Sequence, residues 1–214
     1  MKKVDVMIFD LDGTLIDSKK DIAASVNYTM ATLDLPPLSN ELIYSFVGNG
    51  VTPLIEKSVL ASGGYSFQQA LQIFKDHYTQ HLLDTTQTFE GILETLNHFQ
   101  KKLMFVVTNK SQGYSDKIIK GLGLDHFFQG IFGGDTQFPK KPAPDVIHHI
   151  LKKTTCPPDK AVLIGDSAVD IQTGKNAKIL TCGVTYGFRP REEIEKSLCD
   201  DLIENPEELI KLFE

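Results

Sequence analysis

The spacing of short apolar runs is the feature that most restricts the fold of this sequence. Four runs rich in β-branched and other apolar residues cover residues 4–9, 103–108, 161–165 and 179–184, and a weaker candidate covers 130–134. Apolar residues at helical spacing lie between the later runs, for example Val146, Ile147, Ile150 and Leu151. Strands that alternate with helices predict an α/β fold, a doubly wound parallel sheet with a Rossmann-like core and helices on both faces.

One connection in this pattern is too long to be a simple crossover. After the first run, about seventy residues of helical pattern precede the second run. We therefore expect a small α-helical domain at residues 15–85, inserted into an α/β core of residues 1–14 and 86–214. Local signals mark its helices: Ile22, Val26, Met30 and Leu33 at helical spacing, Thr52 with Pro53 as N-cap and first turn, and Ser66 with Gln69 as a capping box.

Acidic and polar residues stand at the ends of three predicted strands. Asp10, Thr108 and Asp166 each fall at or just past the carboxyl end of a run, where open parallel sheets bind their ligands. Asp12 would project to the same side as Asp10, and Asp170 follows Asp166 by one helical turn. Carboxylates brought together repel one another unless a cation lies between them or one carries a proton. Because Mg²⁺ prefers oxygen ligands, the pattern predicts a Mg²⁺ site at this edge.

Each motif has a plainer interpretation when taken alone. The stretch DLDG is typical of a turn in which Asp12 hydrogen-bonds its own backbone. A calcium-binding loop would need its glycine at the sixth position, whereas Gly13 is the fourth residue. The stretch TNK at 108–110 could be a strand end before a helix N-cap, and KKPAP at 140–144 an exposed loop into a helix. The order of the motifs along the chain favours one shared site.

Charge and cysteine content exclude several classes of partner. Lys and Arg total 22 against 28 Asp and Glu, so the formal charge of −6 offers no diffuse basic surface to nucleic acid or an anionic membrane. Asp5 and Asp10 interrupt the N-terminal apolar run, which therefore suits neither a signal peptide nor a membrane span. The 3 cysteines have no metal-binding spacing and suit a reducing compartment. We expect a cytoplasmic monomer or homodimer.

Taken together, the motifs resemble those of the haloacid dehalogenase superfamily of phosphotransferases. DLDGT at 10–14, VTN at 107–109, KPAP at 141–144 and GDSAVD at 165–170 stand in the family's motif positions, and the inserted helices resemble its small cap domain. The resemblance implies that Asp10 is the nucleophile and Asp12 the general acid/base. It also implies that phosphate oxygens are held by Thr108, Asn109 and Lys141.

The resemblance further implies Mg²⁺ as the cofactor. Asp10, Asp166 and the backbone carbonyl of Asp12 would bind the ion, and Asp170 would support its shell. A dehalogenase expels halide, which needs no proton, whereas an acid at the Asp12 position can protonate an alkoxide. We therefore expect a phosphohydrolase or phosphomutase that acts on a small phosphorylated metabolite.

Within the superfamily, three segments look closest to phosphoglycolate phosphatases: LPPLSNELIYSFVGNGV at 35–51, GGDTQFPKKPAPD at 133–145 and VTYGF at 184–188. Sugar phosphatases, pyrophosphatases and β-phosphoglucomutases share the scaffold and stay open as alternatives. A phosphoacceptor signalling module would use similar residues, but that fold is shorter and has no helical insertion. A binding protein without catalytic activity is disfavoured because every expected catalytic residue is present.

Recognition of an anionic substrate by the cap is the least constrained prediction. The only arginines are Arg189 and Arg191, so no cap arginine can bind a substrate carboxylate. The loop Gly48-Asn49-Gly50 could do so, because it precedes a helix whose free amides favour an anion; a plain glycine turn is the alternative. Arg189 could lie at the surface or reach the site. Side chains without a motif position or a third metal ligand are expected to be solvated: Lys110, Lys140, His77 and His81.

Overall fold

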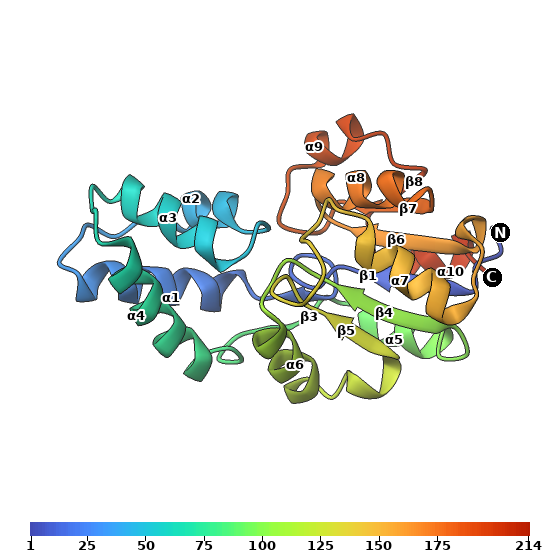
Figure 1. The fold of residues 1–214 in the computed structure, drawn as a ribbon, viewed down its shortest axis with the longest axis horizontal. Coiled ribbons are helices and arrows are strands. Elements are labelled where there is room, and N and C mark those ends of the chain that lie inside the picture. The colour runs from blue at the N-terminus through green and yellow to red at the C-terminus, as the bar shows by residue number, and fades with distance from the viewer. The chain divides into compact units, whose positions relative to one another are not determined.

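The computed structural model describes residues 1–214, which form two compact units. The core unit comprises Met1–Asp17 and Thr88–Glu214, and the inserted unit comprises Ser18–Gln87 (Figure 1). The chain leaves and re-enters the core through two short strands, β2 (Ile16–Asp17) and β3 (Gln87–Thr88), which pair with each other. The inserted unit therefore begins and ends two or three residues later than the expected 15–85.

The core unit is built on a six-stranded sheet in the order β5-β4-β1-β6-β7-β8. Every adjacent pair is parallel, which confirms the doubly wound sheet. The strands are β1 (Val6–Phe9), β4 (Leu103–Val107), β5 (Gly130–Phe132), β6 (Ala161–Gly165), β7 (Leu180–Val184) and β8 (Asp201–Ile203). The sequence pattern missed β8, because three residues that begin with an acid carry too little strand signal.

The register of the central strands brings their carboxyl ends to one edge. Phe9 at the end of β1 is level with Val106 of β4 and Ile164 of β6. Residues that directly follow these strands therefore emerge side by side. Residues 6–9 of β1 are at most 1% exposed, so this edge is held by a rigid, fully buried strand.

Helices cover both faces of the sheet (Figure 1). They are α5 (Ile92–His98), α6 (Gln112–Gly121), α7 (Asp145–Thr154), α8 (Ala168–Ala177), α9 (Arg191–Lys196) and α10 (Glu208–Leu212), with short 3₁₀ turns at Asp125–Phe127 and Pro158–Lys160. The predicted apolar face of α7 packs on side chains of β1, β4 and β6 in one core cluster. None of the helices has the length and apolar character that a membrane span requires.

The inserted unit consists of four helices: α1 (Lys19–Thr32), α2 (Asn40–Phe46), α3 (Val51–Ala61) and α4 (Phe67–Gln80). One predicted N-cap is wrong, and one predicted capping box does not form. Gly50, at φ 89°, caps α3 and places Thr52 inside the first turn. Ser66 does precede α4, but its ψ of 61° departs from the extended backbone of a capping box, and its side chain accepts no capping hydrogen bond.

Asp21 in the first turn of α1 ties down the end of the inserted unit. Its carboxylate accepts hydrogen bonds from the backbone N–H and the hydroxyl of both Thr85 and Thr86, at 2.6–3.0 Å. Burial alone would raise the pKa of Asp21, but these hydrogen bonds outweigh it and hold the pKa below its usual value. The charged form of Asp21 therefore stabilises this unit.

Candidate active site

The candidate site lies at the carboxyl edge of the sheet, on the loops that follow β1, β4 and β6 and on the loop that precedes α7. The structure buries the predicted core-unit residues there, each at most 8% exposed: Asp10, Thr108, Asn109, Lys141, Asp166 and Asp170. The side chain of Asp12 is 12% exposed. Strand register brings three of these loops together, because they start from neighbouring parallel strands, and the loop before α7 adds Lys141.

Two glycines allow the loops to close around Asp166. Gly13 has φ +83°, and a Cβ atom there would lie 2.1 Å from Oδ2 of Asp166. A Cβ atom on Gly187 would lie 2.3 Å from Cβ of Asp166, so neither position has room for a side chain. The backbone N–H of Phe188 donates to the same Oδ2 atom at 2.7 Å. The carboxylate of Asp166 is thus fixed between the first and last loops of the site.

Lys141 joins two of the acids. Its Nζ atom lies 2.8 Å from Oδ1 of Asp10 and 2.5 Å from Oδ1 of Asp170. Burial lowers the pKa of Lys141, but the two carboxylates raise it above its ordinary value, so the ammonium group stays charged. Burial raises the pKa of Asp10 to about 6, with Lys141 opposing the rise. Asp10 is consequently ionised for the most part at neutral pH.

Asn109 and Asp170 support Lys141 from two sides. Oδ1 of Asn109 accepts the backbone N–H of Lys141 at 3.0 Å, and its Nδ2 donates to the Lys141 carbonyl at 3.3 Å. The side chain expected to hold a phosphate oxygen is therefore bonded to the neighbouring loop. Oδ2 of Asp170 accepts from the N–H and the hydroxyl of Ser167 at 3.1 and 2.6 Å, a capping box that starts α8.

The expectation that Lys110 is solvated is wrong. Its side chain is 6% exposed, and its Nζ atom donates to both carboxylate oxygens of Asp12, at 3.0 and 3.1 Å. The backbone N–H of Lys110 donates to Oγ1 of Thr108 at 3.2 Å, which turns the chain back toward the site directly after β4. One feature of the sequence could have predicted this burial: Lys110 lies two residues after Thr108, in the same loop at the end of β4. Lys140 is exposed, as expected.

Arg189 lies near the site, whereas His77 and His81 belong to the inserted unit. Arg189 is half-buried and close enough to Asp166 for its charge to oppose the burial that raises the pKa of that carboxyl well above its usual value. His77 and His81, in the inserted unit, are partly exposed, with 41% of the His81 side chain open to solvent, and their rings stack with centroids 4.1 Å apart and planes 19° apart. Nδ1 of His77 lies 2.9 Å from Oγ of Ser25, and Nδ1 of His81 lies 2.7 Å from Oδ2 of Asp84, so each ring already has a polar partner.

The acidic residues fit a divalent cation. Asp10, Asp166 and Asp170 each offer an oxygen, and these atoms lie within 4.8 Å of one another. Oδ1 of Asp10 is buried and accepts no hydrogen bond of good geometry despite the nearby Lys141. The four carboxylates of the site outnumber its cationic side chains, which are the buried Lys110 and Lys141 and the half-buried Arg189 near Asp166. A divalent ion that prefers oxygen ligands would offset the repulsion among these carboxylates.

The loop Gly48-Asn49-Gly50 belongs to the inserted unit. Gly48 and Gly50 have φ of 117° and 89°, in the region that glycine tolerates and other residues avoid. The loop leads into α3, and the backbone N–H groups in the first turn of a helix have no acceptor within that helix. Its role in binding an anion stays a prediction.

Comparisons with known proteins agree with this geometry. A family model described as "Haloacid dehalogenase-like hydrolase" matches residues 7–184. A phosphoglycolate phosphatase of Colwellia psychrerythraea is 34% identical over 205 residues, which cover 92% of this chain and 91% of that protein. A phosphoglycolate phosphatase of Aquifex aeolicus is 33% identical over 211 residues, which cover 98% and 96%.

Two solved structures have the same architecture. One is a crystal structure from Haemophilus somnus 129PT of a protein described as a predicted phosphoglycolate phosphatase. It has a TM-score of 0.95 and 27% identity, and the match covers 99% of each chain. The other is a haloacid dehalogenase-like family protein from Streptococcus pneumoniae, with a TM-score of 0.88, 26% identity and 99% coverage of each chain.

Proposed function

Because this chain belongs to the haloacid dehalogenase-like hydrolases, we propose that it is a Mg²⁺-dependent phosphatase that hydrolyses phosphoglycolate through a phosphorylated Asp10. The observation that carries the proposal is the position of Asp10, 2.8 Å from the buried ammonium of Lys141 and beside Asp166 and Asp170. A carboxylate in this place has a buried cation beside it and two further acids that could share a metal ion with it. Both are needed to bring it against a phosphate dianion.

In the first step, a carboxylate oxygen of Asp10 forms a bond to phosphorus as the ester O–P bond breaks. Asp12, which takes up a proton before this step, gives it to the departing alkoxide. Lys141 and the hydroxyl of Thr108 stabilise the charge on the phosphoryl oxygens in transit. A bound Mg²⁺, held by Asp10, Asp166 and the carbonyl of Asp12 with Asp170 in support, would offset the repulsion between nucleophile and phosphate.

In the second step, water attacks the phosphorus of the aspartyl phosphate. The Asp12 carboxylate, now unprotonated, takes a proton from this water, and the bond between phosphorus and Asp10 breaks. Inorganic phosphate leaves, and both aspartates return to their starting protonation states. The same side chain thus serves as acid and then as base, which requires that it stay next to the leaving oxygen throughout.

The names of the relatives and the cap loop support phosphoglycolate as the substrate. The Colwellia and Aquifex proteins, both named phosphoglycolate phosphatases, match along nearly the whole chain. The loop Gly48-Asn49-Gly50 supplies backbone amides at the start of α3, a suitable receptor for a carboxylate in an inserted unit without arginine.

The test is phosphate release from a panel of small phosphomonoesters in the presence of Mg²⁺. We expect turnover with several of them and the highest kcat/KM for phosphoglycolate. After an acid quench, phosphate should be found covalently bound to Asp10 by mass spectrometry. Failure to release phosphate from any monoester would contradict the phosphatase assignment, and a clear preference for another ester would contradict the substrate alone.

A further inference from the structure

We propose that Lys110 is a positioning residue for Asp12, which holds this carboxylate at the leaving-group side of the site. The inference rests on the proposed function and adds a residue to it that the motifs do not include. It starts from one contact: Nζ of Lys110 is 3.0 Å from Oδ1 and 3.1 Å from Oδ2 of Asp12. Both side chains are largely shielded from water, at 6% and 12% exposure.

The need for such a contact follows from the charges around Asp12. Asp12 carries the same charge as the clustered Asp10, Asp166 and Asp170 at the same edge of the sheet, and its own side chain keeps 12% exposure to solvent. Nearly equal distances to both oxygens mean that Lys110 offsets the charge of Asp12 and also restricts rotation of the carboxylate group. Without Lys110, Asp12 would lose a contact that restrains both of its oxygens.

The two buried lysines serve different acids. Lys141 contacts Asp10 and Asp170, which lie on the side of the nucleophile. Lys110 contacts Asp12, whose proposed task is proton transfer to the leaving oxygen. Loss of Lys110 should therefore impair the reaction in proportion to its need for a proton donor. A lysine that bound the phosphate itself would affect every substrate alike.

The experiment compares kcat/KM for phosphoglycolate and p-nitrophenyl phosphate in the unmodified enzyme and in Lys110→Met. The parameter kcat/KM reports events up to release of the alcohol or nitrophenol, so later hydrolysis of the aspartyl phosphate does not affect it. Nitrophenolate leaves without a proton, whereas an alkoxide needs the acid. We expect Lys110→Met to lower kcat/KM on the order of 10²-fold for phosphoglycolate and less than about threefold for p-nitrophenyl phosphate.

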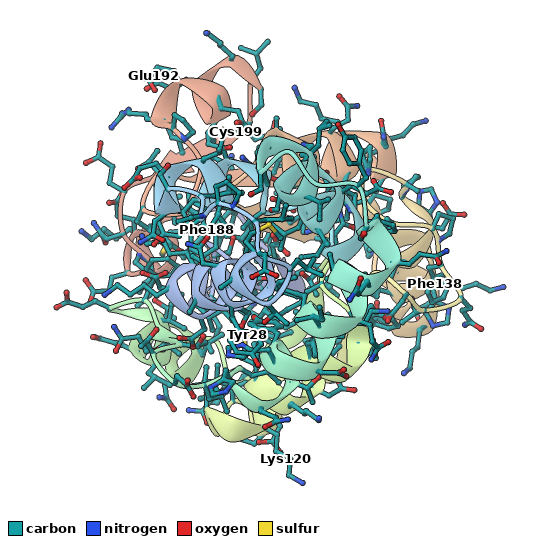
Figure 2. The ribbon with its side chains drawn as sticks, turned by 90° about the vertical axis from the view of Figure 1, so that its left-hand side faces the viewer. Tyr28, Lys120, Phe138, Phe188, Glu192 and Cys199 are labelled. Atoms are coloured by element: carbon teal, nitrogen blue, oxygen red, sulfur yellow. The ribbon has the colours of Figure 1, made fainter.

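A double substitution and a matched control sharpen the result. In an Asp12→Asn background, Lys110→Met should cause no further selective loss, because the group that it positions has gone. Lys120→Met makes the same change at an exposed lysine of α6 that points into solvent (Figure 2) and should leave both substrates unaffected. If Lys110→Met does not fold, Lys110→Arg, which keeps the charge but shifts the donors, should show a smaller loss with the same selectivity.

Equal losses for the two substrates would overturn the proposal. If inhibition by inorganic phosphate also weakened, Lys110 would be a phosphate ligand; if only the melting temperature fell, its role would be structural. Additive losses in the double variant would likewise contradict it. These outcomes differ from failure of the proposed function, in which the unmodified enzyme itself releases no phosphate.

Discussion

The side chain of Asn109 is hydrogen-bonded at both ends of its amide to the backbone of Lys141. Lys141 N–H donates to Oδ1 at 3.0 Å, and Nδ2 donates to the Lys141 carbonyl at 3.3 Å. The two residues lie on different loops, and the contact fixes the segment from which the Lys141 ammonium reaches Asp10. The position of the Lys141 ammonium beside the nucleophile thus depends on the neutral side chain of Asn109.

Replacing Asn109 with Ala should therefore impair Lys141 indirectly. Loss of both hydrogen bonds should lower kcat/KM for phosphoglycolate by about 10- to 100-fold and the stability by about 1–3 kcal/mol, since a buried N–H loses its partner. Asn176→Ala is the matched control, because Asn176 donates to the carbonyl of the next residue, Pro142, from an exposed position. Steady-state kinetics and urea unfolding provide both values; equal effects of the two substitutions would contradict this role.

The two acids of the first loop should fail in different ways. Asp10→Asn removes the proposed nucleophile, so no substrate should be turned over. Asp12→Asn keeps it, so p-nitrophenyl phosphate should release up to one equivalent of nitrophenol rapidly and then stall, because hydrolysis of the aspartyl phosphate lacks its base. Rapid mixing distinguishes the two. Steady turnover by Asp12→Asn near the unmodified rate, with no burst, would show that Asp12 is not the acid/base.

Removal of divalent cations with a chelator should abolish activity, and Mg²⁺ should restore it. Ca²⁺ should not restore it, because its larger and looser coordination shell would misplace Asp10. Since a bound ion also offsets the repulsion among the clustered carboxylates, Mg²⁺ should raise the melting temperature of the unmodified protein and raise it less in Asp166→Asn. Equal turnover with Ca²⁺, or activity that survives the chelator, would contradict the metal site.

If the cap loop binds the substrate carboxylate, substitution of Gly50 should reduce selectivity. We expect Gly50→Leu to reduce the preference for phosphoglycolate over glycerol phosphate while sparing p-nitrophenyl phosphate. Because Gly50 has φ 89°, any side chain also strains the backbone, so Gly63→Leu, at φ 75° in open space of the same unit, controls for strain. Equal kcat/KM for phosphoglycolate and glycerol phosphate in the unmodified enzyme would rule the loop out.

Asp21 should stabilise the inserted unit in a pH-dependent way. Its folded pKa lies below the unfolded value of about 3.9, so its stabilisation is complete above that pH and is lost as the pH falls through the folded pKa. Asp21→Asn should lower the free energy of unfolding by about 2 kcal/mol at pH 7. The difference should shrink below about pH 4. Asp76→Asn, an exposed acid of α4, should show no such trend in chemical denaturation.

Local pattern was sufficient to place the strands and the acids that follow them. Apolar runs and helical spacing are properties of neighbouring residues, and parallel strands must bring their carboxyl ends together. Asp10, Thr108 and Asp166 could therefore be assigned to one edge before any contact was known. The same local pattern misplaced the N-cap of α3 at Thr52 and predicted a capping box at Ser66 that does not form, because backbone angles set by the surrounding loop decide the capping geometry.

Only the tertiary structure decided which side chains pair within the site. Lys110 and Asp12 are 98 positions apart, and Asn109 and Lys141 are 32 apart, with no periodicity to relate them. Whether a lysine after a strand is solvated or buried depends on the direction in which its loop turns and on the charged side chains that lie next to it in the folded protein. These are properties of loops packed against one another, so sequence spacing predicts the edge where chemistry occurs, and packing determines the partners there.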